Sequence, residues 1–318
     1  MKNRTGIVTK STGSWYTVRD ENGSFYDCRI KGKLRIKGIR TTNPVAVGDM
    51  VNFTVQEEWS ENKNQIGIIS SLHDRKNYII RKSINLSKES QIIAANVDQA
   101  ILIVTVNYPV TTSIFIDRFL ASAEAYNIPV TLVFNKIDLY NEKEMERVNE
   151  LFGTYIEIGY PCIGTSTETG QGLKEMKDCM NGRINVFAGH SGVGKSTLIN
   201  KIDPALQLKT AEISDYHLQG KHTTTFAEMF ELSFGGYIID TPGIRGFGMI
   251  DMYKEETSHF FREIFKASDG CRFNNCTHTH EPGCAVLKAV EDGKIALSRY
   301  ESYLNILEGD DEKYRSAF

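Results

Sequence analysis

The chain has 318 residues, a formal net charge of −3 and 41% hydrophobic residues. These values are typical of a globular protein with two or three domains, and they exclude a protein that is strongly basic as a whole. Met1–Lys10 is polar and does not read as a signal peptide, and the apolar run 100–106 is too short to span a bilayer. We therefore expect a cytoplasmic protein that makes no membrane contact.

Residues 1–72 show the alternating pattern of short β-strands separated by turn residues such as Glu21-Asn22-Gly23. We expect five strands, at Thr5–Thr9, Trp15–Arg19, Ser24–Ile30, Met50–Val55 and Ile66–Ser70. Five short strands with these turns predict a small closed barrel, an OB-fold, as the first domain.

The barrel carries a basic stretch, Arg29–Arg40, in which six lysines and arginines occur with no acidic residue among them. This pattern favours contact with nucleic-acid phosphates over a merely solvated face. Two interpretations remain open for the nearby aromatic residues Tyr16, Phe25, Tyr26 and Trp59. They fill the barrel core, which we favour, or they stack on single-stranded RNA bases.

The remainder divides into a polar linker at 73–95, an α/β domain at 96–249 and a mainly helical segment at 250–318. In the second of these, apolar β-branched runs alternate with helical patterns, as in a doubly wound parallel sheet. The expected strands are 100–106, 130–134, 161–163, 184–188, 230–234 and 237–239, and the expected helices are 115–126, 142–152 and 173–180.

Residues 189–196 read G-H-S-G-V-G-K-S, a complete phosphate-binding loop between the strand 184–188 and a helical run. The glycines let backbone N–H groups surround phosphate oxygens, and the helix N-terminus adds further donors. Lys195 can reach the β- and γ-phosphates and assist catalysis, while the Ser196 hydroxyl can bind Mg²⁺. The candidate nucleotide-binding residues here are Gly189, His190, Ser191, Gly192, Val193, Gly194, Lys195, Ser196 and Thr197.

A base-reading loop is expected at Asn135-Lys136-Ile137-Asp138, after the strand 130–134. The Asp138 carboxylate can accept two N–H bonds from guanine, a pair that adenine does not offer. Asn135 would tie this loop to the phosphate loop, and the Lys136 stem would cover the base. Asp138 therefore argues against the alternative of an ATP-using kinase or transporter component.

Three further segments are similar to conserved elements of G proteins. Ser166–Leu173 resembles S-A-K-T-G-x-G-L, with Thr167 where alanine is usual, and predicts guanine contacts from Ser166 and Thr167. Asp240-Thr241-Pro242-Gly243 matches D-x-x-G, in which Asp240 holds Mg²⁺ through water and the Gly243 N–H senses the γ-phosphate. In the segment 220–225, one threonine is expected to bind Mg²⁺, with Thr224 as the candidate.

The order of these elements is permuted, because both base-reading loops precede the phosphate loop. In this order, and in the segment 220–225, the chain resembles the circularly permuted RsgA (YjeQ/YloQ) GTPases over nearly its whole length. The resemblance implies an OB-fold, binding to the small ribosomal subunit and its rRNA, and a role in late maturation of that subunit. Since the chain leaves the GTPase domain after 240–243, we expect residues 250–318 to report the nucleotide state.

A metal site is expected in the C-terminal segment, where Cys271, Cys276 and Cys284 lie at ligand spacing with a histidine. Both His278 and His280 are possible fourth ligands, and the pattern of the resembled family favours His278. Three thiolates and one imidazole suit a structural Zn²⁺ ion, because four protein ligands leave no open position.

The hydrolytic residue is less evident, because Ile244 stands where many GTPases place a water-orienting glutamine. His222 is the candidate, by its place in the segment 220–225, by its chemistry and by the family resemblance. A histidine that packs or contacts rRNA is the alternative. The sequence thus predicts a monomeric, Mg²⁺-dependent enzyme that converts GTP to GDP and is stimulated by the small subunit. The alternative is an rRNA-binding scaffold that uses GTP as a structural ligand.

Overall fold

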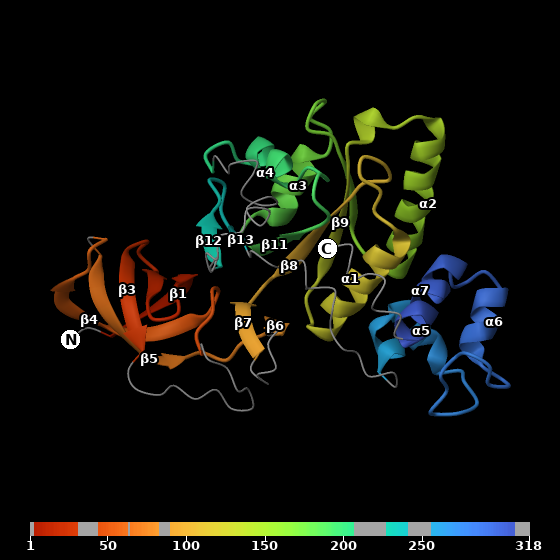
Figure 1. Ribbon diagram of the computed structural model, residues 1–318, viewed down its shortest axis with the longest axis horizontal. Coiled ribbons are helices and arrows are strands. Elements are labelled where there is room, and N and C mark those ends of the chain that lie inside the picture. Colours follow the sequence, from red (N-terminus) through yellow and green to blue (C-terminus); the bar gives the residue numbers. More distant parts are fainter. Residues whose placement is uncertain are drawn as a thin grey trace, which may run out of the picture. The chain divides into compact units, whose positions relative to one another are not determined.

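A computed structural model describes residues 3–30, 44–62, 64–82, 90–206, 227–240 and 256–308. The chain forms two compact units (Figure 1). The first comprises residues 1–100, 176–187 and 199–244, and the second comprises residues 101–175, 188–198 and 245–318. Among the described residues, no helix combines the length and the apolar character needed to cross a membrane.

A closed five-stranded barrel opens the first unit, as predicted (Figure 1). The strands pair in the order β1-β2-β3-β5-β4, and β4 pairs again with β1, so that the sheet closes. All pairs are antiparallel except β3 with β5. The strands are β1 (Asn3–Ser11), β2 (Tyr16–Asp20), β3 (Phe25–Ile30), β4 (Met50–Trp59) and β5 (Gln65–Leu72).

The period-two pattern of these strands explains the barrel core. Inward positions on neighbouring strands form one buried apolar cluster that includes Val18, Cys28, Phe53 and Ile69. Gly67 is required beside this cluster, because a side chain there would come within 2.5 Å of the Cys28 sulfur. The barrel therefore closes around a packed interior rather than a channel.

The segment 73–95 differs from the predicted linker. Its described part forms an antiparallel pair, β6 (Tyr78–Lys82) with β7 (Ser90–Ala95), in which Ile79, Ile92 and Ala94 are buried. Each strand contains a short apolar run that is buried only where the two strands pair with each other. The first unit also contains the parallel pair β11 (Ile184–Ala188) with β13 (Tyr237–Asp240), and β12 (Glu228–Glu231) antiparallel to β13.

The second unit contains the strands that lead to the predicted base-reading loops. Strand β8 (Gln99–Val104) begins at the boundary of the units and lies beside β9 (Val130–Asn135), which pairs in parallel with β10 (Cys162–Thr165). Every residue of β8 and β9 is buried, as expected of strands covered on both faces. Helices α1 (Ser113–Ala125) and α2 (Glu142–Ile158) belong to the second unit, whereas α3 (Leu173–Met180) and α4 (Lys195–Ile202) begin in the second unit and end in the first.

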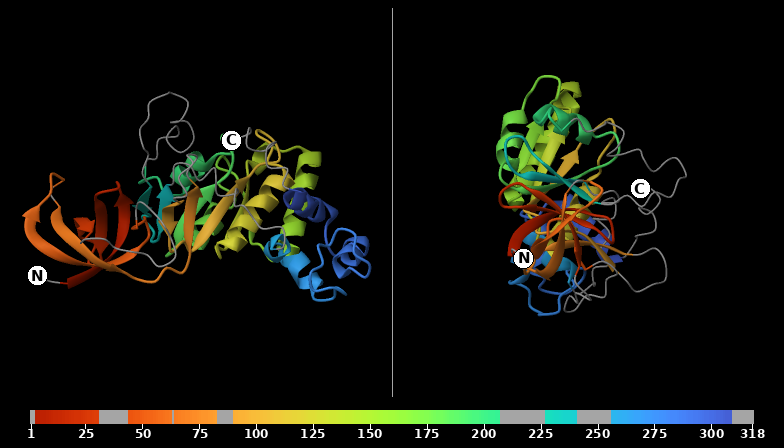
Figure 2. Two further views of the ribbon diagram at one scale, coloured as in Figure 1. Left: turned by 60° about the horizontal axis from the view of Figure 1, so that its bottom comes forward. Right: turned by 90° about the vertical axis from the view of Figure 1, so that its left-hand side faces the viewer.

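The C-terminal helices pack around the predicted metal ligands. They are the 3₁₀-helix η3 (Thr257–Phe260), α5 (Arg262–Ser268), α6 (Ala285–Glu291) and α7 (Leu297–Glu308). Their apolar side chains form one cluster with Ala121 of α1, and both views show α5 and α7 lying against α1 (Figure 2). The expected helical segment is therefore packed directly onto the second unit's α/β part.

Candidate nucleotide-binding site

The phosphate loop begins directly after β11 and ends where α4 starts, at Lys195. Gly189 and Gly194 have φ values of +136° and +97°, in the region that favours glycine. An added Cβ at Gly189 would lie 2.6 Å from the Ile103 carbonyl oxygen, and one at Gly194 would lie 2.6 Å from the Asn135 amide nitrogen. The two glycines let the loop pass close to the ends of β8 and β9.

Hydrogen bonds join the phosphate loop to the first base-reading loop. The Asn135 amide donates to the carbonyl of Val193 at 2.9 Å and accepts a hydrogen bond from Thr165 Oγ1 at 2.9 Å. Asn135 and Thr165 are both buried, so these contacts are protected from water. This is the tie expected for Asn135, and it fixes the ends of β9 and β10 against the loop.

Lys136 makes a second link with its ammonium group. Its Nζ donates to the carbonyl of Gly192 at 2.7 Å and to the carbonyl of Tyr108 at 2.6 Å. Lys136 has a left-handed backbone conformation, with φ of +62°, which turns the chain into the 3₁₀-helix η1 (Ile137–Leu139). Asp138 lies in this helix with its carboxylate exposed, so it can receive hydrogen bonds from a ligand.

The segment after β10 forms a tight turn. The buried Ser166 hydroxyl accepts hydrogen bonds from the backbone N–H groups of Glu168 at 3.2 Å and Thr169 at 3.1 Å. Gly172 has φ of +71°, and a side chain there would come within 2.1 Å of the Gly164 carbonyl oxygen. The turn thus holds the backbone of Ser166 and Thr167 beside the end of β10.

In the phosphate loop itself, Lys195 Nζ donates to the carbonyls of Gly189 and His190, both at 2.7 Å. The His190 ring lies against the Phe115 ring of α1, with the ring centroids 4.0 Å apart and the ring planes tilted by 33°. Burial and the neighbouring Lys195 charge lower the pKa of His190, so the imidazole is neutral near pH 7. Ser196 is buried at the start of α4, beside the backbone N–H groups of the helix N-terminus.

Several predicted residues cannot be placed. The segment containing His222 and Thr224 lies outside the described residues, as does Gly243. Asp240 ends β13, but its side chain is likewise not described. The structure therefore brings together the loops at 135–138, 165–172 and 189–196 within the second unit.

Comparison with known proteins assigns the chain to a family. The family model for the RsgA GTPase matches residues 72–250, and the model for the RsgA N-terminal domain matches residues 5–61. This chain belongs to the RsgA GTPase family. The small ribosomal subunit biogenesis GTPase RsgA 2 of Bacteroides thetaiotaomicron is 58% identical over 314 residues, covering 98% of this chain and 99% of that protein.

Other RsgA relatives agree in sequence and in fold. RsgA of Flavobacterium psychrophilum is 57% identical over 98% of this chain and 95% of its own length. The crystal structure of YjeQ from Thermotoga maritima has a TM-score of 0.78 at 37% identity and covers 97% of this chain and 98% of its own. YloQ, described as a circularly permuted GTPase, has a TM-score of 0.75 at 29% identity and covers 98% and 96%. The circular permutation predicted from motif order is confirmed.

The chain also contains a cluster that can hold a metal ion. Ligand atoms of Cys271, Cys276, His278 and Cys284 all lie within 4.8 Å of one another. The Cys271 and Cys284 sulfurs are 3.9 Å apart, and His278 Nδ1 is 3.6 Å and 3.5 Å from them. Zinc–sulfur bonds of about 2.3 Å at tetrahedral angles give sulfur–sulfur edges of about 3.8 Å, so the donor set fits Zn²⁺.

The structure distinguishes the two candidate histidines. His278 is buried, and its φ of +57° turns the imidazole into the cluster. His280 is exposed, and its Nδ1 pairs with the Thr279 hydroxyl at 2.8 Å. The geometry therefore favours His278 over His280 as the fourth ligand.

The barrel aromatics divide between the two interpretations. Tyr16 and Tyr26 are 1% and 4% exposed and belong to the core, whereas Phe25 and Trp59 are 46% and 65% exposed. Adjacent strand residues point to opposite faces, so the pair Phe25-Tyr26 could have been divided this way from the sequence. The guanidinium of Arg29 lies 3.9 Å from the centre of the Trp15 ring, and residues 31–40 of the basic stretch are outside the described part.

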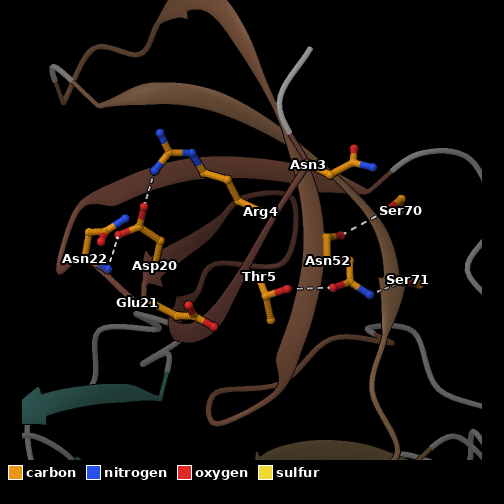
Figure 3. Close-up of a pocket in the computed structure, with 9 residues that line it drawn as sticks. All are labelled: Asn3, Arg4, Thr5, Asp20, Glu21, Asn22, Asn52, Ser70 and Ser71. Carbon is orange, nitrogen blue, oxygen red and sulfur yellow. Dashed lines mark hydrogen bonds and ion pairs between the residues drawn. The ribbon is translucent and has the colours of Figure 1, made fainter.

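The barrel also has an open hollow of about 690 Å³ that contains none of the predicted nucleotide residues (Figure 3). Its polar groups largely pair with one another. Thr5 donates to Asn52, Asn52 donates to Ser71, and Arg4 forms an ion pair with the buried Asp20. Because Glu21 adds another negative charge, the hollow does not favour a phosphate-bearing ligand.

Two residues beside the phosphate loop, Tyr108 and Phe115, were not predicted from the sequence to contact the site. Tyr108 supplies a carbonyl to Lys136, and Phe115 supplies the ring under His190. Tyr108 precedes Pro109 in a short loop after β8, and the only signal was its position at the carboxyl end of a buried strand. Phe115 gave no signal, because an aromatic residue at the start of a helix is usually a core residue.

Proposed function

We propose that this chain binds GTP at the joined loops 135–138, 165–172 and 189–196, and hydrolyses it to GDP and phosphate. The observation that supports this proposal best is the buried hydrogen bond between the Asn135 amide and the Val193 carbonyl. It joins an element suited to reading guanine to an element suited to holding phosphates, although 58 residues separate them in sequence.

Each residue then has a defined task. Asp138 accepts the guanine N1 and 2-amino hydrogens, and the backbone of Ser166 and Thr167 contacts the guanine oxygen. The amides of residues 189–197 and the Lys195 ammonium group surround the phosphates. Ser196, Asp240 and Thr224 would hold Mg²⁺, which would neutralise negative charge on the phosphates during hydrolysis.

The site of action is the small ribosomal subunit, during its late maturation in the cytoplasm. Relatives at 55–58% identity carry the name small ribosomal subunit biogenesis GTPase. The exposed Phe25 and Trp59 rings and the Arg29–Trp15 pair on the barrel are suited to stacking on unpaired rRNA bases. The basic stretch that continues to Arg40 supplies charges for rRNA phosphates.

Turnover in the presence of the subunit tests the enzymatic function. Because Ile244 cannot orient water, we expect slow GTP hydrolysis alone and at least about tenfold faster hydrolysis with small subunits. His222→Ala should lower the subunit-stimulated rate at least about tenfold, to near the rate without the subunit, while GTP affinity is unchanged. His259→Ala is the control, since His259 lies in η3, away from residues 220–225 in sequence. If His222→Ala is still stimulated, His222 has no part in the mechanism. If the unmodified protein shows no stimulated turnover, the rRNA-binding scaffold is the function that remains.

Removal of the metal tests the zinc assignment. Tyr300 and Tyr303 of α7 donate to the carbonyls of His278 and Thr277, and Cys284 caps α6, so the site organises both helices. We expect one Zn²⁺ per chain, and chelation should reduce helical circular dichroism and lower the melting temperature by about 10 °C. A purified protein that lacks zinc and retains both properties contradicts the assignment.

A further inference from the structure

Helix α1 contacts the phosphate loop through Phe115 and the C-terminal helices through Asp117 and Ala121, all within the second unit. Its residues Ile116–Ala123 are all buried, so both of its sides are covered. Phe115 and Asp117 are two residues apart and therefore point about 200° apart around the helix axis. One contacts the phosphate loop and the other contacts the C-terminal helices.

On the C-terminal side, a buried ion-pair network holds α1 to α7. Arg299 Nη1 donates to Asp117 Oδ1 at 2.7 Å, and the two side chains are 1% and 0% exposed. Arg299 Nε also donates to Glu263 Oε1 at 2.6 Å, and the Tyr155 hydroxyl donates to the same Asp117 oxygen at 2.7 Å. Burial alone lowers the pKa of Arg299, but Asp117 and Glu263 raise it, so the guanidinium stays charged.

The same helix α7 is fixed to the metal-binding loop. The hydroxyl of Tyr300, next to Arg299, donates to the carbonyl of the ligand His278 at 2.7 Å. Tyr303 donates to the carbonyl of Thr277 at 2.7 Å, and its ring contacts Phe261 edge to face. The metal loop therefore determines where α7, and with it the Arg299 guanidinium, is held.

On the other side, α1 contacts the phosphate loop through one aromatic pair. Phe115 is the third residue after the N-cap Thr112, whose hydroxyl accepts a hydrogen bond from the Phe115 N–H at 3.3 Å. The cap fixes the first turn, and the Phe115 ring lies against His190 with a centroid separation of 4.0 Å. Since His190 is inside the phosphate loop, the position of α1 constrains that loop.

We propose that Phe115 and Arg299 are positioning residues that couple the metal-binding module (the C-terminal helices and the Cys271–Cys284 loop, residues 256–308) to the phosphate loop through α1. The path runs from His278 through Tyr300 and Arg299 to Asp117, and from Phe115 to His190. Every contact on it is within the second unit. The metal-binding module thereby influences the nucleotide affinity of the phosphate site through contacts on α1. This inference depends on the proposed phosphate site.

A double-mutant cycle on the affinity for a fluorescent GDP analogue tests this coupling in the zinc-loaded full chain. Phe115→Leu keeps an apolar side chain but removes the ring, and Arg299→Lys keeps the charge but loses the paired hydrogen bonds. We expect each change to weaken GDP binding about fivefold. The double variant should bind about as weakly as either single variant, because both interrupt the same path.

Matched variants separate this result from a general loss of structure. Phe265→Leu removes a second phenylalanine–histidine contact, with His259 at 5.2 Å, and should leave GDP affinity unchanged. Phe115→Tyr keeps the aromatic ring and should bind GDP as tightly as the unmodified protein does. If Arg299→Lys does not fold, Tyr300→Phe takes its place, because it removes only the hydrogen bond to the His278 carbonyl. Independent effects that multiply to about 25-fold, or no effect of either α7 variant, would overturn the coupling. Failure of the unmodified protein to bind GDP would instead refute the proposed phosphate site.

Discussion

The variant Gly194→Ala is expected to lose nucleotide binding almost completely, with GTP and GDP affinities lowered at least about 100-fold. The added Cβ would lie 2.6 Å from the Asn135 amide nitrogen, in a loop whose φ of +97° already disfavours any side chain. Asn135 cannot yield, because it is buried and hydrogen-bonded to both Val193 and Thr165. The clash therefore breaks the contact that joins the two loops. Titration with a fluorescent GDP analogue measures the loss.

The matched control for this variant is Gly293→Ala. Gly293 also has a positive φ, +71°, but its missing side chain would meet nothing within 4 Å. Both variants carry the backbone cost of about 1 kcal/mol, and only Gly194→Ala has the clash. If Gly194→Ala binds GDP as Gly293→Ala does, the loops do not depend on each other as the structure indicates.

Asp138→Asn is expected to reverse base selectivity, with GTP affinity lowered about 100-fold and xanthosine triphosphate becoming the preferred ligand. The carboxylate accepts hydrogen bonds from two guanine N–H groups. An asparagine instead turns its NH₂ group toward the guanine 2-amino group, and because both are donors, neither is paired. Xanthine carries a carbonyl at that position and accepts the new donor. Competition between the two nucleotides for the fluorescent analogue gives the ratio directly.

An equivalent change elsewhere checks that this effect belongs to the base site. Asp269→Asn alters an exposed carboxylate that follows α5 and should change neither affinity. Equal loss of GTP and xanthosine triphosphate binding in Asp138→Asn would mean that Asp138 supports the loop without reading the base.

Local patterns predicted most of the individual elements. Period-two alternation placed the five barrel strands, because in a small barrel each residue faces either the core or the solvent. Helix α3 and strand β11 begin and end where expected, since Gly172 and Gly189 break the pattern beside them. The tie through Asn135 was also foreseeable, because the motif that contains it has a fixed relation to a phosphate loop.

Long-range partners could not be predicted in the same way. Asp117 and Arg299 belong to no sequence motif, and only the packing of α7 on α1 makes them a buried pair. The strands β6 and β7 were read as a linker, because their buried positions depend on pairing with each other across residues 83–89. The contact between the Phe115 and His190 rings joins residues 75 positions apart in the sequence, and no motif predicts it.

A crystal structure of the chain with a non-hydrolysable GTP analogue and Mg²⁺ tests the central claim most directly, namely that residues 135–138 and 189–196 form one guanine-nucleotide site. In that structure we expect the guanine N1 and 2-amino nitrogens within about 3 Å of the Asp138 carboxylate oxygens. We also expect that Lys195 Nζ leaves the Gly189 and His190 carbonyls for the β- and γ-phosphates of the same molecule. A nucleotide whose phosphates occupy the loop while its base lies away from Asp138 would contradict the claim.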